Sequence, residues 1–148
     1  MIQTMNQKQT HKFTIDGQMP NLNDFIRAER TQFRSRTGKF MTKGATMKKE
    51  YQHNATISIR RDLKRLKVEN PVLLKYSFYE PNKKRDHDNV ASFAMKVIQD
   101  ALVEVGVLKN DGWKEIVGFE CQFYVDAQKP RIEVEIIEIQ SKVKEGKI

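Results

Sequence analysis

The longest regular apolar pattern in the chain has a helical period and covers residues 89–105. Apolar residues recur there every three or four positions, which predicts a helix with one nearly continuous buried stripe. The stripe consists of Val90, Phe93, Ala94, Val97, Ile98, Ala101, Leu102 and Val105. Gly106 follows directly and is a typical C-cap residue. Met95 and Val103 fall outside the stripe, so we expect them to be exposed and available for a dimer contact.

A second helix is predicted over residues 45–67, where apolar residues again recur at helical spacing from Met47 to Leu66. Asn70 and Pro71 end this pattern, because the residue before a proline avoids the helical conformation. The other faces of this helix are basic and carry Lys48, Lys49, Arg60, Arg61, Lys64, Arg65 and Lys67. Two interpretations stay open for that surface: it is simply solvated, or it contacts phosphate.

Apolar and polar residues alternate in four other stretches, which predicts strands at residues 12–15, 72–80, 116–125 and 131–139. A turn at residues 126–130 joins the last two, so we expect them to pair as a hairpin. In the third strand the residues expected to face inward are Val117, Phe119, Cys121, Phe123 and Val125.

The resulting order, β-α-β-α-β-β, predicts an α+β fold of two layers, with a mixed β-sheet and two long helices on one face. A chain of 148 residues is long enough for one domain with a real core. We therefore expect a single domain over residues 1–148, with flexible polar tails at about residues 1–10 and 141–148. Residues 25–30 allow one or two helical turns.

Charge narrows the range of partners. Lys and Arg number 27 against 19 Asp and Glu, so the net charge is +8, which favours nucleic acid or an anionic membrane as the partner. No apolar run approaches the roughly 20 residues that span a bilayer, and the polar start of the chain lacks the features of a signal peptide. The single cysteine, Cys121, fits a reducing compartment and excludes a zinc site built on cysteines. We therefore expect a cytoplasmic protein that does not bind a membrane.

Residues 31–44 are predicted to form a loop in which basic and aromatic residues alternate. The mixture suits phosphate contact combined with base stacking, and it includes Arg34, Arg36 and Lys39 with Phe33 and Phe40. The alternative is a solvated loop whose phenylalanines pack on the core.

Three carboxylates bracket the helix at residues 89–105, with Asp86 and Asp88 before it and Asp111 after it. In an extended chain, residues two apart point to the same side at a spacing of about 7 Å, so two carboxylates can converge on one divalent cation. Asp111 joins them only if its loop folds back along a helix about 25 Å long. The basic run Lys83-Lys84-Arg85 leads into the pair and suits a polyanion, so the pattern indicates a metal-dependent nuclease.

Each aspartate also has a purely structural interpretation. Asp88 is a good N-cap, Asp111 forms a favoured turn pair with the following glycine, and Asp86 can pair with Arg85 on the surface. His87 points away from both neighbouring aspartates in an extended chain, which disfavours it as a metal ligand.

The segment from Lys84 to Asp111 resembles the RusA-type Holliday junction resolvases. The similarity rests on Arg85-Asp86-x-Asp88-Asn89, Asp100-Ala101-Leu102, Gly106-Val107 and Asn110-Asp111. It extends more loosely to the Pro20-x-x-Asn23 turn and to the end of the chain.

This resemblance implies a homodimer that cuts four-way DNA junctions with paired symmetric nicks during recombination and repair. It implies Mg²⁺, or Mn²⁺, held by Asp86, Asp88 and Asp111. We expect the basic run Lys83, Lys84 and Arg85 to hold the phosphate backbone of the DNA.

The resemblance also implies a catalytic lysine on the helix. Counting back from Asp100 gives Lys96, whereas counting forward from Asp88 gives Ser92. We expect Lys96 to fill the role; the alternative is a surface ion pair between Lys96 and Asp100.

Other functions stay open: a non-catalytic basic module that binds nucleic acid, a metal-dependent nuclease acting on other branched DNA or on RNA, and a small adaptor that binds proteins.

Overall fold

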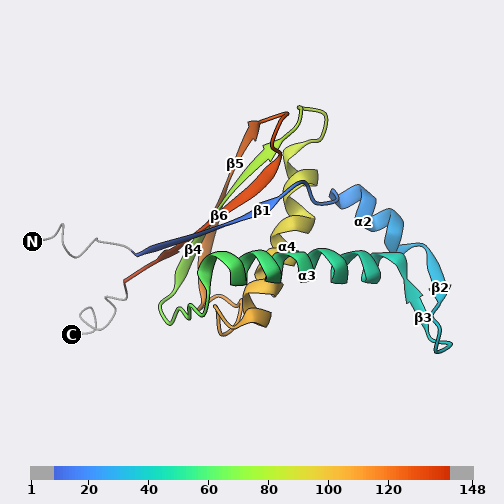
Figure 1. The fold of residues 1–148 in the computed structure, drawn as a ribbon, viewed down its shortest axis with the longest axis horizontal. Helices are drawn as coiled ribbons and strands as arrows, with labels where there is room; N and C mark the ends of the chain where they lie inside the picture. Colours follow the sequence, from blue (N-terminus) through green and yellow to red (C-terminus); the bar gives the residue numbers. More distant parts are fainter. Residues whose placement is uncertain (1–8, 141–148) are drawn as a thin grey trace, which may run out of the picture.

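The computed structural model describes residues 9–140, so most of the predicted N-terminal tail and all of the predicted C-terminal tail lie outside the described residues. The described part contains three helices (Figure 1), which are α2 (Leu22–Glu29), α3 (Lys43–Leu63) and α4 (His87–Val105). No helix in residues 9–140 is both long enough and apolar enough to cross a membrane.

The main sheet has four strands: β1 (Thr10–Asp16), β4 (Val72–Glu80), β5 (Ile116–Val125) and β6 (Arg131–Glu138). Their order is β1-β6-β4-β5, with β4 and β5 parallel and the other neighbours antiparallel. The predicted mixed sheet is therefore confirmed.

The helices gather on one side of this sheet and give the two-layer α+β fold that the pattern predicts (Figure 1). Alternate residues of β4 are buried, and Tyr76 at its centre is fully enclosed. The Tyr76 hydroxyl contacts the Gln99 amide of α4 at 3.1 Å. Burial raises the pKa of Tyr76 well above its ordinary value, and the Gln99 hydrogen bond only partly opposes this. The buried stripe of α4 packs on the same residues, so the sheet and the helices share one core.

The expected hairpin between the last two strands is wrong. β4 lies between β5 and β6, and the turn at residues 126–130 passes over the end of β4. There the Asp126 amide donates to the Glu80 carbonyl at 2.7 Å. A short turn normally joins paired neighbours, but β4 ends at Glu80, just before Pro81, and the chain crosses over its end.

β5 is an edge strand, and this changes the burial expected for it. Val117, Phe119 and Val125 are all at least half exposed, at 55%, 55% and 50%, whereas Cys121 and Phe123 are partly buried. An edge strand has a neighbour on one side only, so part of its inward face stays uncovered.

Met95 and Val103, by contrast, are partly buried and pack against the core, which corrects the expectation that they are exposed. Met95 Sδ lies 3.7 Å from Cys121 Sγ of β5.

Residues 31–44 do not form a plain loop. They contain β2 (Gln32–Arg34) and β3 (Phe40–Thr42), an antiparallel hairpin that projects from the start of α3, away from the main sheet (Figure 1). Gly38 has φ +84° at its turn, a conformation that glycine adopts without steric cost. α3 begins directly after the hairpin and ends at Leu63, four residues before the predicted end.

Candidate active site

The connection from β4 to α4 is held by one arginine. Arg85 Nε and Nη2 donate to the two carboxylate oxygens of Glu80 at 3.0 and 2.9 Å, and Nη1 donates to the Met19 carbonyl at 2.9 Å. This bidentate geometry is the strongest form of such a pair. The surface pair between Arg85 and Asp86 is therefore wrong, because Glu80 is the partner of Arg85. The predicted contact of Arg85 with DNA has to compete with these internal bonds.

Asp86 and Asp88 lie together at the start of α4. Asp86 is the N-cap, although its side chain makes no capping hydrogen bond, and Asp88 is in the first turn. The capping role expected for Asp88 is therefore wrong; its Oδ1 accepts from the Asn89 amide at 3.0 Å. Both aspartates are exposed. The positive end of the helix dipole stabilises two carboxylates at this position.

Asp111 lies on a loop that turns back onto α4. Gly106 caps the helix with φ +95°, and the amides of Val107 and Leu108 both donate to the Leu102 carbonyl. Val107 and Leu108 are buried, which holds the loop on the core. The Asp111 carboxylate then lies 3.9 Å from Lys96 Nζ, so the loop does fold back along the helix.

Lys96 belongs to a network that joins α3 and α4. Its Nζ lies 3.1 Å from Asp100 Oδ1, as the alternative of a surface pair expects, and Lys48 Nζ of α3 lies 2.7 Å from Asp100 Oδ2. Burial acts to raise the pKa of Asp100, but the hydrogen bonds from the two lysines outweigh it, and the net pKa is below its ordinary value. Asp100 is therefore an anion that binds both ammonium groups, and Lys96 links it to Asp111.

The three predicted metal ligands do not form one cluster within this chain. Among residues 9–140 no three His, Cys, Asp or Glu side chains are grouped closely enough to hold a metal ion. Asp88 and Lys96 are eight residues apart on one helix, about 12 Å along its axis. Asp86 and Asp88 are both at the start of α4, whereas Asp111 is joined through Lys96 to Asp100 farther along the helix. Carboxylate oxygens are the ligands that Mg²⁺ prefers, so the side chains of Asp86 and Asp88 are chemically suited to bind this ion.

The basic residues predicted to bind DNA occupy two places. Lys83 and Lys84 are exposed in the connection before α4. Arg34, Arg36 and Lys39 are exposed on the hairpin β2–β3. Residues 30–49 contain seven Lys and Arg and no Asp or Glu, so the hairpin and the first turns of α3 are uniformly positive.

The hairpin also presents aromatic surface. Phe33 and Phe40 are 36% and 64% exposed, so the alternative that they pack on the core is wrong. The Arg34 guanidinium lies 4.4 Å from the centre of the Phe40 ring and donates to the Gly38 carbonyl at 3.1 Å. A cation held over an aromatic face is already ordered before any ligand binds.

The base of the hairpin is fixed to the two helices beside it. Thr42 Oγ1 donates to Glu29 Oε1 of α2 at 2.6 Å and accepts from the Ala45 amide of α3 at 3.0 Å. Gly44 leaves space for this carboxylate, because a Cβ at Gly44 would lie 2.6 Å from Glu29 Cγ. The direction in which the hairpin projects is thus set by side chains at its base.

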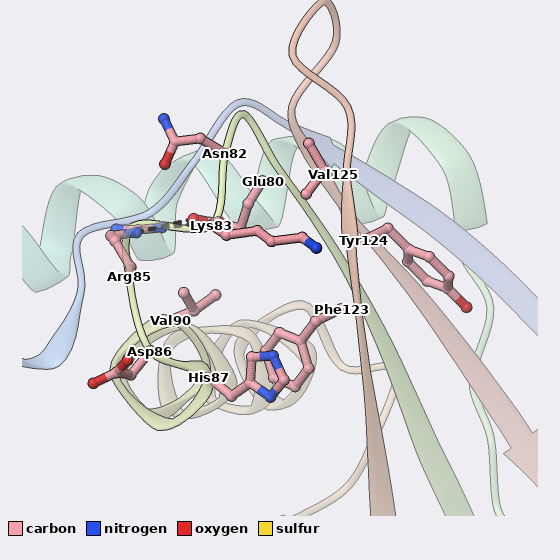
Figure 2. Close-up of a pocket in the computed structure, with 10 residues that line it drawn as sticks. All are labelled: Glu80, Asn82, Lys83, Arg85, Asp86, His87, Val90, Phe123, Tyr124 and Val125. Carbon is pink, nitrogen blue, oxygen red and sulfur yellow. Dashed lines mark hydrogen bonds and ion pairs between the residues drawn. The ribbon is translucent and has the colours of Figure 1, made fainter.

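A pocket of about 580 Å³ lies beside the start of α4 (Figure 2). Asp86 and His87 line it from the helix, Lys83 from the connection, and Phe123 and Val125 from the end of β5. The rings of His87 and Phe123 are parallel, with centroids 3.8 Å apart. Nothing in the sequence indicates that the end of β5 meets the start of α4, so this pair was not predicted. The ion pair between Lys48 and Asp100, which joins α3 to α4, was not predicted either. The four-residue spacing of Lys96 and Asp100 indicated only the pair within α4.

Paired carboxylates at a helix start, lysines around them and a projecting basic hairpin define a protein that acts on a polyanion such as nucleic acid. The model of the family described as Endodeoxyribonuclease RusA matches residues 24–137. The chain belongs to the RusA endodeoxyribonuclease family, as the sequence resemblance indicated, and the protein is accordingly an endodeoxyribonuclease. A comparison with individual curated proteins gives no match.

Proposed function

We propose that the protein is a Mg²⁺-dependent homodimer that resolves four-way DNA junctions by paired symmetric nicks in recombination and repair. The observation that carries the proposal is the pair of exposed carboxylates, Asp86 and Asp88, at the start of α4 in a member of the RusA endodeoxyribonuclease family. The exposed lysines Lys83 and Lys84 come shortly before them in the chain.

DNA binding rests on the positive surfaces. Lys83 and Lys84 hold the phosphates next to the carboxylates, and the hairpin residues Arg34, Arg36 and Lys39 hold a neighbouring duplex arm. Phosphate contacts position the DNA without reading its sequence, which suits selection by the shape of the substrate.

Catalysis rests on the acidic groups and Lys96. Asp86, Asp88 and Asp111 are the proposed ligands of Mg²⁺ or Mn²⁺, of which the first two are neighbours and the third approaches from the loop after α4. A bound divalent ion would lower the pKa of a water and neutralise charge on the phosphate. Lys96 adds a positive charge where negative charge grows during cleavage. Its contact with Asp111 couples the lysine to that loop.

A two-fold homodimer explains paired nicks. A four-way junction has approximate two-fold symmetry, and an isologous dimer presents two identical sites related by the same operation. Each subunit then cuts one of two equivalent strands.

The test is nicking of a labelled synthetic four-way junction in Mg²⁺, beside linear duplex and structured RNA. Asp86→Asn and Asp88→Asn should abolish nicking while junction binding stays intact, because each change removes a charge from the ligand pair without removing a DNA contact. Asp16→Asn, which alters an exposed aspartate at the end of β1, is the matched control. Full cleavage by either variant contradicts the metal assignment, and preference for RNA or linear duplex contradicts the proposed substrate.

A further inference from the structure

The pocket beside α4 ends a continuous series of stacked rings that begins in the core. Phe78 is buried on β4, and its ring stacks on Phe123 of β5 with centroids 5.3 Å apart and planes 15° from parallel. Phe123 in turn stacks on His87 at 3.8 Å and 1°. His87 is exposed, so the series runs from the interior to the surface and stops there. Its last members form a flat aromatic wall of the pocket (Figure 2).

The remaining walls of the pocket are of mixed character. Val90 and Val125 add apolar surface, Asn82 adds an amide, and Lys83 extends its ammonium group across the opening toward the end of β5 (Figure 2). The volume of about 580 Å³ lies inside the roughly 300–1,000 Å³ range of small-ligand sites. A flat ring, an amide and an ammonium group together match a planar heterocycle that is joined to a phosphate.

The walls of this pocket are held in place before any ligand arrives. Glu80 forms part of the lining and is bound by Nε and Nη2 of Arg85, whose Nη1 donates to the Met19 carbonyl. His87 is the first residue of α4, and the buried stripe of that helix fixes its backbone. A site that is ordered in advance loses less entropy on binding.

We propose that this pocket receives one nucleobase of the DNA, unstacked from its neighbours and stacked on the ring of His87, whose other face is covered by Phe123, next to the phosphate that is cut. The proposal rests on the proposed function, because Asp86 lines the same pocket and immediately precedes His87. A phosphate held at Asp86 therefore has its adjoining nucleotide within reach of the aromatic wall. Bases at a branch point give up less stacking and pairing than bases within a duplex, so a branched substrate provides such a base at low cost.

The experiment places 2-aminopurine, a base whose fluorescence reports stacking, at each position around the branch point of a four-way junction. Binding is measured without divalent metal, so that cleavage does not interfere. With the wild-type protein, the fluorescence at one position should change severalfold on binding. His87→Ala should remove that change while junction affinity stays within about twofold, since the phosphate contacts remain. His87→Phe should preserve the change, because it keeps the flat ring and loses only the nitrogens.

A second variant tests the pocket without touching the ring. Val125→Trp fills the pocket from an exposed position that tolerates a larger side chain, and it should also abolish the change in fluorescence. A change of fluorescence in His87→Ala equal to that of the wild type overturns the proposal, as does loss of the change in His87→Phe. If the wild-type protein does not bind the junction, the proposed substrate fails. If it binds and nicks the junction with no position responding, only the base pocket fails.

Discussion

Lys96 Nζ lies 3.9 Å from the Asp111 carboxylate and 3.1 Å from that of Asp100, which joins the middle of α4 to the loop beyond its end. The family resemblance left the position of the catalytic lysine open between Lys96 and Ser92. Ser92 Oγ donates to the Asp88 carbonyl at 2.6 Å, which is a local hydrogen bond within the helix. The serine side chain is also neutral, so it cannot supply a positive charge. The contact with Asp111 therefore favours Lys96.

Replacing Lys96 with methionine keeps the length of the side chain and removes its charge. We expect Lys96→Met to slow junction nicking by about 10²–10³-fold, the usual effect of losing one group that stabilises transition-state charge. Junction affinity should change by less than about threefold. Lys48→Met is the matched control, because Lys48 shares Asp100 with Lys96 but makes no ion pair with Asp111. Equal loss of nicking in both variants would assign Lys96 a structural role only.

Asp100 should contribute stability that depends on pH. Its pKa is lowered in the folded protein below the ordinary value of 3.8, since the hydrogen bonds from Lys48 and Lys96 outweigh the effect of burial. The contribution is therefore complete above the ordinary pKa and is lost as the pH falls through the lowered one. At pH 7 we expect Asp100→Asn to reduce the free energy of unfolding by about 1 kcal/mol, and the difference to shrink in strong acid.

Urea unfolding of wild type and Asp100→Asn at neutral and acidic pH measures this difference. Glu104→Gln is the control, because Glu104 is also on α4 but its partner is the neutral amide of Gln52. A difference between wild type and Asp100→Asn that grows toward acid pH would show that the lysines do not stabilise the Asp100 anion.

Local patterns predicted the helices and strands well, because each depends on neighbouring residues. The period of the apolar stripe located α4, and Gly106 marked its end. The bounds of β4 and β5 match the alternating segments, since Pro81 and the turn after Val125 interrupt the pattern.

The arrangement of the helices and strands relative to one another was harder to predict from the sequence. A short turn after β5 predicted a hairpin, yet β4 lies between the two strands, because strand order depends on pairing across the whole chain. The hairpin β2–β3 was missed because strands of three residues are too short to show an alternating pattern. Of the candidate site, the spacing argument for Asp86 and Asp88 assumed an extended chain, whereas Asp88 lies in the first turn of α4. The positions of Asp111 and His87 depend instead on where a loop and a strand end pack.

The hairpin should account for part of the salt dependence of DNA binding. Each phosphate contact contributes about 0.9 to the slope of log affinity against log salt, so Arg36→Ala with Lys39→Ala should reduce that slope by about 2. Arg65→Ala with Lys67→Ala removes the same charge beyond the far end of α3, a helix about 30 Å long. The slope should change little in this control. Titration of a fluorescent junction at several salt concentrations measures the slope for both double variants. Equal reductions of the slope would mean that only the net charge of the protein determines the salt dependence.

Gly44 should be required for the position of the hairpin. Replacing glycine by alanine within a helix usually stabilises it by roughly 0.5–1 kcal/mol. Here the new Cβ would lie 2.6–2.7 Å from the Glu29 side chain, so the carboxylate has to move and its 2.6 Å bond with Thr42 is lost. We expect Gly44→Ala to lower the free energy of unfolding by about 1 kcal/mol instead, because the loss of one hydrogen bond to a charged group, about 1.5–3 kcal/mol, exceeds the gain from alanine.

A double-mutant cycle isolates the cause of that loss. In a Glu29→Ala background the carboxylate is absent, so Gly44→Ala should become neutral or stabilising. Junction affinity should follow the same pattern, falling in Gly44→Ala more than in the double variant, because the displaced carboxylate disturbs a positively charged hairpin. If Gly44→Ala stabilises the protein in both backgrounds, Glu29 does not occupy the space beside Gly44 and the hairpin is not oriented from its base.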